Sequence, residues 1–220
     1  MKENKELEFI AINKNLLIEV LSLQSNNKDD TQTIKFIEEF CKTKKLKYEK
    51  DTYGNIYVTK GKTSLYPCCV SHVDGVHKIH KDYKIFEEDG QLFAYSSSNM
   101  SQVGTQGDDL CGVYICLQLL IDQPNMKVVF FKDEEVGTLG SKEANMAFFK
   151  DCTVVLQPDR KGNSDLIIDA AGIELCSSEY LDHISAITKE YMYKPTQGSL
   201  TDVRTLKMKG LDVCSNNISC

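Results

Sequence analysis

Short, nearly continuous apolar runs alternate with amphipathic segments along most of this 220-residue chain, and no other feature constrains its fold more. The runs at residues 65–70, 126–131 and 153–156 have the length and composition of strands buried on both faces of a sheet. Apolar residues at helical spacing mark residues 13–23 and 110–120. This alternation predicts a three-layer, single-domain α/β fold, in which helices flank a mixed, mostly parallel sheet.

The other expected elements follow from turn signals, helix caps and weaker periodicity. They are a helix at 31–46 capped by Asp30 or Thr31, a hairpin of 48–53 and 55–59 around Gly54, a side ribbon of 83–86 and 91–95, a loop at 96–106, a helix at 141–149 capped by Ser141, a strand at 165–170, helices at 179–191 and 201–207, and a last strand at 211–214. Because no repeat or linker divides the chain, residues 1–220 are expected to form one domain.

Composition excludes several classes of function. The net charge is −6 and charged residues make up 26% of the chain without a long run of one sign, which argues against a nucleic-acid surface. No apolar stretch approaches the roughly 20 residues of a membrane-spanning helix, and residues 1–6 lead into no secretory signal, so we expect a cytoplasmic protein. Nine cysteines without a CxxC pair indicate reduced, buried thiols.

Acidic stretches stand at the ends of the predicted buried strands. His72-Val73-Asp74 follows the first, Glu134-Glu135 the second and Asp159 the third, while Asp108-Asp109 opens a helix. Ligands of open α/β sheets collect outside the carboxyl ends of the strands. One histidine and several carboxylates can hold two divalent ions with a shared carboxylate between them. Together these stretches predict a metal-dependent hydrolase site.

Each stretch also has a plainer interpretation. His72 and Asp74 share one face of a strand, so Asp74 can orient the imidazole, although a surface pair gives the same pattern. Asp108-Asp109 could simply favour a helix N-terminus. One carboxylate of Glu134-Glu135 can bind metal while the other acts as a general base, yet a solvated loop is equally acidic. Asp159 after Pro158 suits an ordinary turn.

The order of these motifs resembles the co-catalytic zinc metallopeptidases of the peptidase T, aminoacylase and carboxypeptidase G type, which are related to the zinc aminopeptidases. The resemblance covers about residue 50 to the end of the chain. It rests on the segments Ser71-His72-Val73-Asp74-Gly75-Val76, Gly107-Asp108-Asp109-Leu110-Cys111-Gly112, Asp133-Glu134-Glu135-Val136-Gly137-Thr138-Leu139-Gly140-Ser141, Pro158-Asp159-Arg160 and Gly198-Ser199-Leu200-Thr201-Asp202.

The resemblance implies a site with two zinc ions and assigns a role to each motif. One ion would be held by His72 and Asp159, the other by Glu135, and Asp108 would bridge both. Glu134 would then be the general base. By the same resemblance, Asp74 orients the histidine and the peptide bond between the two adjacent aspartates is expected to be cis.

The chain departs from the family pattern at three places. Leu110 stands where the family usually has Lys, and the histidine that normally completes the second zinc site is absent from this sequence. A longer natural chain, a ligand from another chain and an impaired site all remain open. Only 42 residues lie between Asp159 and Asp202, so the lid of about a hundred residues seen in dimeric members does not fit there.

The function expected from this resemblance is zinc-dependent hydrolysis of peptide (amide) bonds, by an aminopeptidase or small-peptide peptidase with a small peptide as substrate. A deacylase of N-acyl amino acids shares the same chemistry and stays open. So does a catalytically impaired, single-metal or metal-free binding module of the same fold. No nucleic acid or membrane partner is expected, and the oligomeric state is left undetermined.

Overall fold

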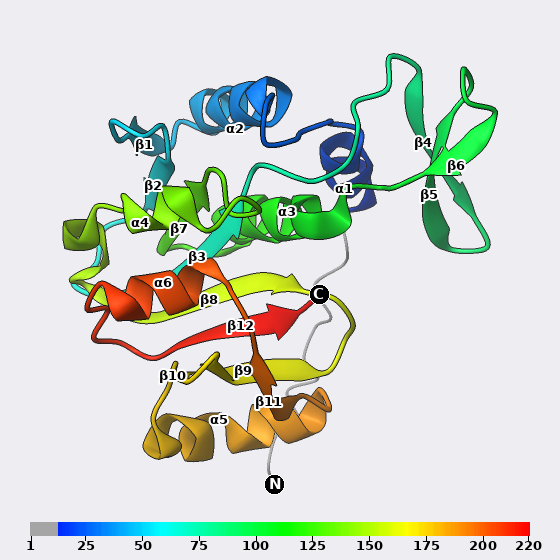
Figure 1. Cartoon of the computed structure of the whole chain (residues 1–220). Coiled ribbons are helices and arrows are strands. Elements are labelled where there is room, and N and C mark those ends of the chain that lie inside the picture. The colour runs from blue at the N-terminus through cyan, green and yellow to red at the C-terminus, as the bar shows by residue number, and fades with distance from the viewer. Residues whose placement is uncertain (1–12) are drawn as a thin grey trace, which may run out of the picture.

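A large mixed sheet forms the centre of the molecule (Figure 1). The computed structural model describes residues 13–220, so the expectation about residues 1–6 lies outside the described residues. The strands are, in spatial order, β1 (Lys47–Lys50), β2 (Ile56–Lys60), β7 (Met126–Phe131), β3 (Tyr66–His72), β8 (Cys152–Arg160), β12 (Ser215–Ser219), β9 (Asp165–Ala170) and β10 (Ile173–Glu174), with β11 (Lys194–Gly198) also paired to β9. The four central strands β7, β3, β8 and β12 run parallel, which confirms the predicted α/β sheet.

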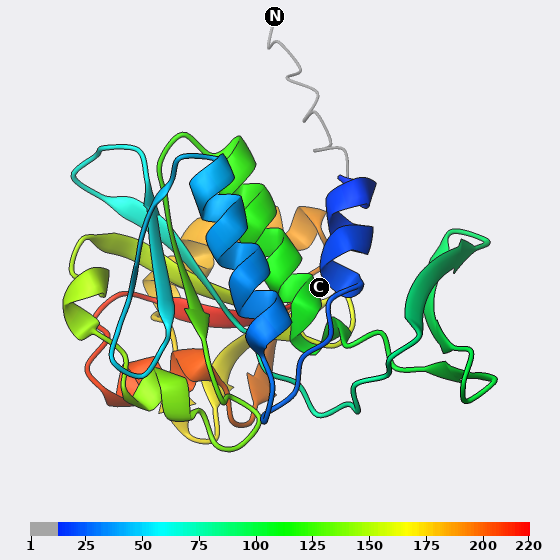
Figure 2. The same ribbon diagram turned by 90° about the horizontal axis from the view of Figure 1, so that it is seen from above.

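Helices lie on both faces of this sheet. They are α1 (Lys14–Leu21), α2 (Thr31–Thr43), α3 (Gly107–Asp122), α4 (Leu139–Lys142), α5 (Ser178–Glu190), α6 (Asp202–Met208) and the 3-10 helix η1 (Met146–Phe149). Figure 2 shows α1, α2 and α3 crossing the face that is turned to the viewer. Side chains of α6 and η1 pack in the hydrophobic cluster of the opposite face. The expected three-layer arrangement is therefore present.

Strand β7 shows why the sequence folds this way. Val128 and Phe130 pack in the cluster that includes α1, α2 and α3, whereas Val129 and Phe131 pack in the cluster on the other face. All four side chains have no measurable solvent exposure. Burying a side chain of this size contributes roughly 1.5–3 kcal/mol, so a continuous apolar run, rather than an alternating one, suits a strand that is covered on both sides.

A three-stranded ribbon extends to one side of the main sheet, as Figures 1 and 2 both show. It consists of β4 (Tyr83–Glu88), β5 (Gln91–Ser96) and β6 (Ser101–Val103), all antiparallel. The hairpin predicted around Asp89-Gly90 is confirmed. The expected loop at 96–106 is partly wrong, because β6 pairs with β5 and extends the ribbon.

Two helix predictions need correction. The helix expected at 141–149 is two short pieces, α4 and η1, and Ser141 lies inside α4, where its hydroxyl donates to the Thr138 carbonyl instead of capping a helix. Asp30 occupies the N-cap position of α2 without a side-chain cap bond. Its carboxylate instead pairs with the Lys132 ammonium at 2.8 Å, an interaction between distant segments that local sequence does not reveal.

The last strand was also misplaced. Residues 211–214 connect α6 to β12, and the strand itself is Ser215–Ser219. Its sequence is polar, which is unusual for a strand within a sheet. The amide nitrogens of its asparagines have partners, because Asn216 Nδ2 donates to the Ile167 carbonyl at 2.9 Å and Asn217 Nδ2 donates to Thr201 Oγ1 at 3.1 Å, whereas Asn216 Oδ1 is buried without a hydrogen-bond partner in the described structure.

Strand β8 is longer than predicted, and its extra length matters for the site. It continues through Pro158 to Arg160, so Asp159 lies on the strand and not in a turn. The short strands β10 and β11 had no clear sequence signal. The nine cysteines are all free thiols; six of them are buried as expected, whereas Cys111 and Cys214 are partly exposed and Cys220 is exposed.

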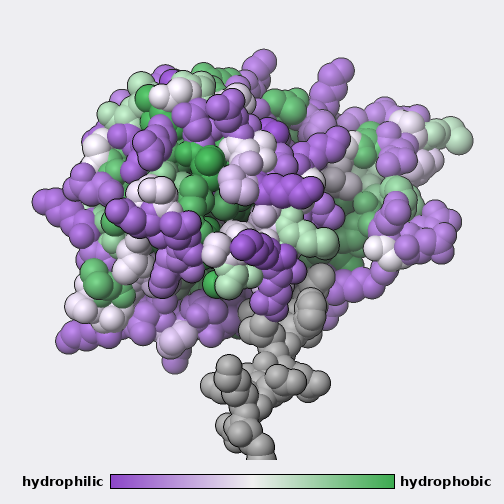
Figure 3. Space-filling view, turned by 90° about the horizontal axis from the view of Figure 1, so that it is seen from below, coloured by the Kyte–Doolittle hydropathy of each residue, from purple (hydrophilic) through white to green (hydrophobic). Residues whose placement is uncertain are grey.

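Helix α5, lowest in Figure 1, lies at the surface and has no fully buried side chain. Seen from below, the surface mixes hydrophilic and hydrophobic residues (Figure 3). Among the described helices, none has both the length and the apolar character that crossing a membrane requires.

Candidate metal centre

The predicted site residues meet at one edge of the sheet. His72 is the last residue of β3 and lies opposite Phe131, the last residue of β7, in the parallel register. Glu134 and Glu135 follow β7 by a few residues, and Asp159 lies near the carboxyl end of the adjacent β8. Parallel strands present their carboxyl ends on the same side, which brings these side chains together.

His72 lies at the middle of the cluster and is 1% exposed. Its Nδ1 lies 3.0 Å from the Asp74 carbonyl oxygen and 3.4 Å from Asp74 Oδ1. On the opposite side of the ring, Nε2 lies 3.1 Å from Asp108 Oδ1 and 3.4 Å from Asp159 Oδ1. Burial opposes a charge on the ring, but the hydrogen bonds to these three aspartates raise the pKa of His72 well above its usual value.

Asp74 has a role that the sequence did not suggest. Besides facing His72, its buried carboxylate accepts hydrogen bonds from the backbone N–H of Glu134 at 3.0 Å and of Glu135 at 3.2 Å. Burial alone would raise its pKa, but His72 and these two N–H groups lower it. Asp74 therefore ties the end of β3 to the loop that carries both glutamates.

The adjacent aspartates at the start of α3 point in different directions. Their peptide bond is cis, as the family resemblance implied. The side chain of Asp108 is 65% exposed and faces His72, whereas Asp109 is 1% exposed. The Asp109 carboxylate accepts from Ser71 Oγ at 2.7 Å, from the His72 N–H at 3.2 Å and from the Gly112 N–H at 3.0 Å.

Two groups of side chains in the described part of the chain could hold a cation, with their ligand atoms within 4.8 Å of one another. One comprises His72, Asp109 and Asp159, and the other His72, Asp108 and Glu135. Because His72 has one ring nitrogen facing the cluster, it can complete only one group at a time. The three hydrogen bonds on Asp109 suit a residue that positions the chain, so Asp108 is the better oxygen ligand beside His72 and Asp159.

The charge of the cluster fits a cation. Burial, reinforced by the charge of Asp202, raises the pKa of Glu134 to about 8, and burial raises the pKa of Glu135 and of Asp159. Glu135 Oε1 is buried without a hydrogen-bond partner in the described structure. Carboxylates crowded in this way repel one another unless a positive charge offsets them. The donor set of imidazole and carboxylates suits zinc.

A buried polar network supports Asp159, and the sequence patterns did not predict this network. Gln157 has no measurable exposure, and its Nε2 lies 3.0 Å from Asp159 Oδ2 and 3.3 Å from Asp202 Oδ2. Its Oε1 accepts from Thr201 Oγ1 at 2.6 Å and from the Val203 N–H at 3.1 Å. Thr201 thus donates to Gln157 and makes no side-chain cap bond to α6, although it occupies the N-cap position. The signal available in the sequence was the Gln-x-Asp spacing, which places both side chains on one face of a strand.

The remaining histidines join neither ligand group. His77 lines a pocket of about 450 Å³ together with Asp108. His80 lies 3.1 Å from the side-chain amide of Asn99, and His183 is on α5. Among the described residues, the group that contains Asp108 and Glu135 therefore has His72 as its only histidine.

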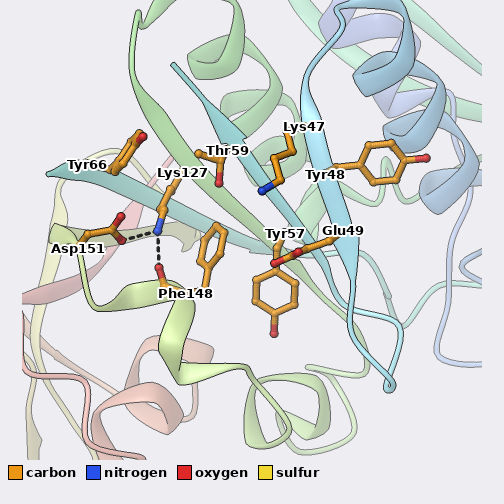
Figure 4. Close-up of a pocket in the computed structure, with 9 residues that line it drawn as sticks. All are labelled: Lys47, Tyr48, Glu49, Tyr57, Thr59, Tyr66, Lys127, Phe148 and Asp151. Carbon is orange, nitrogen blue, oxygen red and sulfur yellow. Dashed lines mark hydrogen bonds and ion pairs between the residues drawn. The ribbon is translucent and has the colours of Figure 1, made fainter. Parts of the chain in front are cut away.

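A pocket elsewhere in the molecule is unrelated to this cluster (Figure 4). Its volume is about 250 Å³, and Lys127 points toward Asp151 and the Phe148 carbonyl. The ammonium lies 2.6 Å from that carbonyl oxygen and 4.3 Å from the centre of the Phe148 ring. These contacts satisfy a buried cation, which is a structural role for Lys127.

The fold is shared with solved peptidases. Neither a sequence model of a protein family nor a curated protein sequence matches the chain. A tripeptidase from Staphylococcus aureus superimposes with a TM-score of 0.58 at 19% identity over 71% of this chain and 45% of that one. Aminoacylhistidine dipeptidase from Vibrio alginolyticus gives 0.59 at 16%, over 70% and 34%. The aminopeptidase PepT from Bacillus cereus gives 0.66 at 12%, over 94% and 89%.

These comparisons establish the catalytic-domain fold of such peptidases. The chain spans less than half of the tripeptidase and of the dipeptidase, but most of the aminopeptidase PepT. At these identities the likeness concerns the fold. The chemistry of this chain has to be argued from its own residues.

Proposed function

We propose that this chain is a metal-dependent hydrolase of peptide (amide) bonds, an aminopeptidase or small-peptide peptidase with zinc as its cofactor. The observation that carries the proposal is that His72 Nε2 faces Asp108 and Asp159, that His72 and Asp108 also form a possible ligand group with Glu135, and that Glu134 is buried. The peptidase fold of the solved neighbours supports the same reaction class.

The principal metal position uses His72, Asp108 and Asp159. The contact between Asp74 and Nδ1 of His72 would leave Nε2 available to bind a cation. The network through Gln157 holds the Asp159 carboxylate in place. A second ion would share Asp108 and take Glu135. Because zinc sites normally carry at least three protein ligands, the second ion is expected to bind more weakly.

Glu134 is proposed as the general base and then as the proton donor. Bound zinc would supply the positive charge that polarises the scissile carbonyl and makes water more acidic. Glu134 takes the proton from the attacking water and returns it to the leaving amine. Its backbone N–H is held by Asp74, so the carboxylate stays beside the cluster through both transfers.

Zinc loading and peptide hydrolysis test this proposal together. We expect purified protein to bind zinc by elemental analysis and to release amino acids from unblocked di- and tripeptides. Glu134→Gln should retain zinc and lose hydrolysis, whereas His72→Ala should lose the tightly bound ion. Glu190→Gln, on the exposed end of α5, is the matched control and should behave as the unchanged protein.

The outcomes separate the alternatives. Hydrolysis of N-acetyl amino acids in preference to peptides would assign the deacylase activity. Zinc binding without any hydrolysis would assign a binding module, and failure to bind zinc at saturating concentration would refute both metal-dependent functions.

A further inference from the structure

The glutamate loop, residues 133–139, carries the two adjacent glutamates and is closed at its ends by one side chain. Asn55, which precedes β2 and has no measurable exposure, accepts from the Lys132 N–H at 3.1 Å through Oδ1 and donates to the Gly140 carbonyl at 2.9 Å through Nδ2. The two ends also bond each other, because the Gly140 N–H donates to the Lys132 carbonyl at 2.9 Å. A Cβ at position 140 would lie 2.3 Å from that carbonyl oxygen, so this close approach requires glycine.

The turn between β1 and β2 holds this amide in one orientation. Asp51 Oδ1 accepts from the backbone N–H groups of Tyr53, Gly54 and Asn55 at 3.0, 2.9 and 3.0 Å, and Asp51 Oδ2 accepts from Asn55 Nδ2 at 2.8 Å. Both protons of the Asn55 amide are thus used, one on Asp51 and one on the glutamate loop. Because one end of the loop requires an acceptor and the other a donor, only one orientation of the amide satisfies both.

Tyr53 supplies a second contact from the same turn. Its hydroxyl donates to Asp133 Oδ2 at 2.7 Å, and Asp133 directly precedes Glu134. Asp133 has a φ of 56°, a left-handed conformation that is uncommon for residues other than glycine, so a contact to its side chain helps to fix the direction of the chain that follows. Burial and the hydrogen bond to Asp133 raise the pKa of Tyr53 to about 12, so the hydroxyl keeps its proton and remains the donor.

We propose that Asn55 and Tyr53 are positioning residues for the two glutamates, so that the turn before β2 sets where the general base lies relative to the metal ligands. The inference rests on the proposed hydrolysis, because Glu134 is its base and Glu135 a ligand of its second ion. Asp74 holds the backbone N–H groups of both glutamates, whereas the turn holds the ends of the loop and the residue before the base. A displacement of about 1 Å can lower a rate by about 100-fold, so these contacts affect turnover as well as stability.

Tyr53→Phe tests the inference by removing one hydroxyl. In the zinc-loaded protein, kcat for the hydrolysis of Leu-Ala should fall by about 10- to 100-fold, while KM changes by less than about twofold and tightly bound zinc is retained. Tyr83→Phe is the matched control, because it also removes one partly buried hydroxyl, which donates to the Leu21 carbonyl at 3.0 Å, and it should keep the original kcat. A merely structural contact would lower stability and leave kcat and KM of the folded protein unchanged.

Changes at Asp133 and Asn55 show whether the hydrogen bonds themselves are responsible. Asp133→Asn keeps an oxygen that can accept from Tyr53, and asparagine tolerates a positive φ, so this variant should retain most of kcat. Asp133→Ala loses both properties and should be at least as slow as Tyr53→Phe. Asn55→Ala releases both ends of the glutamate loop and should lower kcat further. Thermal unfolding shows whether Asn55→Ala still folds, and Tyr53→Phe decides the question if it does not.

Amide hydrogen exchange gives a readout that requires neither metal nor turnover. In zinc-free protein, Tyr53→Phe should speed exchange at the N–H groups of Glu134 and Glu135 by at least about tenfold and leave the amides of β7 unchanged, whereas Tyr83→Phe should change neither. Faster exchange in Tyr53→Phe, without hydrolysis by the unchanged protein, would support the positioning and contradict the proposed function alone. Hydrolysis by the unchanged protein, with kcat and exchange both unaffected by Tyr53→Phe, would overturn the inference and leave the proposed function standing.

Discussion

Replacing Asp74 by Ala tests whether one carboxylate holds the candidate site together. The side chain is 2% exposed and accepts from the N–H groups of Glu134 and Glu135, in addition to facing His72. Leaving a buried donor without a partner costs about 1–3 kcal/mol. Loss of the acceptor for both N–H groups therefore lowers the free energy of unfolding by about 2–6 kcal/mol, a large share of the about 5–15 kcal/mol that is typical of a domain.

Urea denaturation in the presence of EDTA measures this loss without a contribution from metal. Asp74→Asn keeps one oxygen for one of the two N–H groups and should fall between Asp74→Ala and the unchanged protein. The control is Asp212→Ala, an exposed position, with an expected change within about 0.5 kcal/mol.

The same variant also tests the link to the metal. Without Asp74 the imidazole of His72 loses the group that orients it, so zinc affinity should fall by about 10- to 100-fold. If Asp74→Ala lowers the free energy of unfolding by less than about 1 kcal/mol and leaves the zinc affinity unchanged, the reasoning is refuted, because the two N–H groups would then have found other acceptors.

Three further predictions concern the charges buried in and near the site. In zinc-free protein, burial raises the pKa of Glu134 to about 8 and of Asp202 to about 7, and the raised pKa of His72 acts in the same direction. Folding therefore takes up protons, and the free energy of unfolding should fall as the pH rises from 5 to 8, by up to about 1.4 kcal/mol per pH unit for each group. A melting temperature in EDTA that rises over this pH range would contradict the prediction. Gln157→Leu removes the hydrogen-bond partner of the Asp159 and Asp202 carboxylates, the Thr201 hydroxyl and the Val203 N–H, so we expect a loss of about 2–4 kcal/mol in urea denaturation and a weaker zinc affinity in titration. Lys127→Met removes a buried ammonium together with its hydrogen bond to the Phe148 carbonyl and leaves Asp151 unpaired, so thermal unfolding should shift to lower temperature while zinc affinity stays unchanged.

The elements that the sequence predicted well are those whose packing is local or repetitive. The run Met126–Phe131 is apolar because both faces of β7 are covered, and that pattern can be read without knowing what covers it. The same holds for α3, whose apolar face repeats at helical spacing. Because acidic motifs follow the buried strands such as β7 and open the helix α3, the edge of the sheet that carries the site was predictable too.

The elements that were missed depend on partners far away in the chain. Strand β12 is polar, and the side chains of Asn216 and Asn217 donate to groups on β9 and just before α6, far away in the chain. Asp30 has the sequence position of a helix cap, but in the folded chain its carboxylate pairs with the Lys132 ammonium. Periodicity and capping rules describe neighbours within a few residues, so they have no means of detecting either contact.

The second metal position illustrates the same limit on the scale of the site. The motifs place one imidazole, that of His72, in the cluster. In the structure its Nδ1 faces the Asp74 carboxylate and its Nε2 faces the Asp108 carboxylate. A single nitrogen cannot ligate two ions, so His72 can belong to only one of the two candidate groups at a time. If Asp108 bridged two ions, His72 would bind the ion beside Asp159. The ion beside Glu135 would then depend on oxygen ligands. Zinc titration should accordingly show one tight and one weak equivalent, whereas two equally tight equivalents would mean that a ligand outside these groups completes the second position.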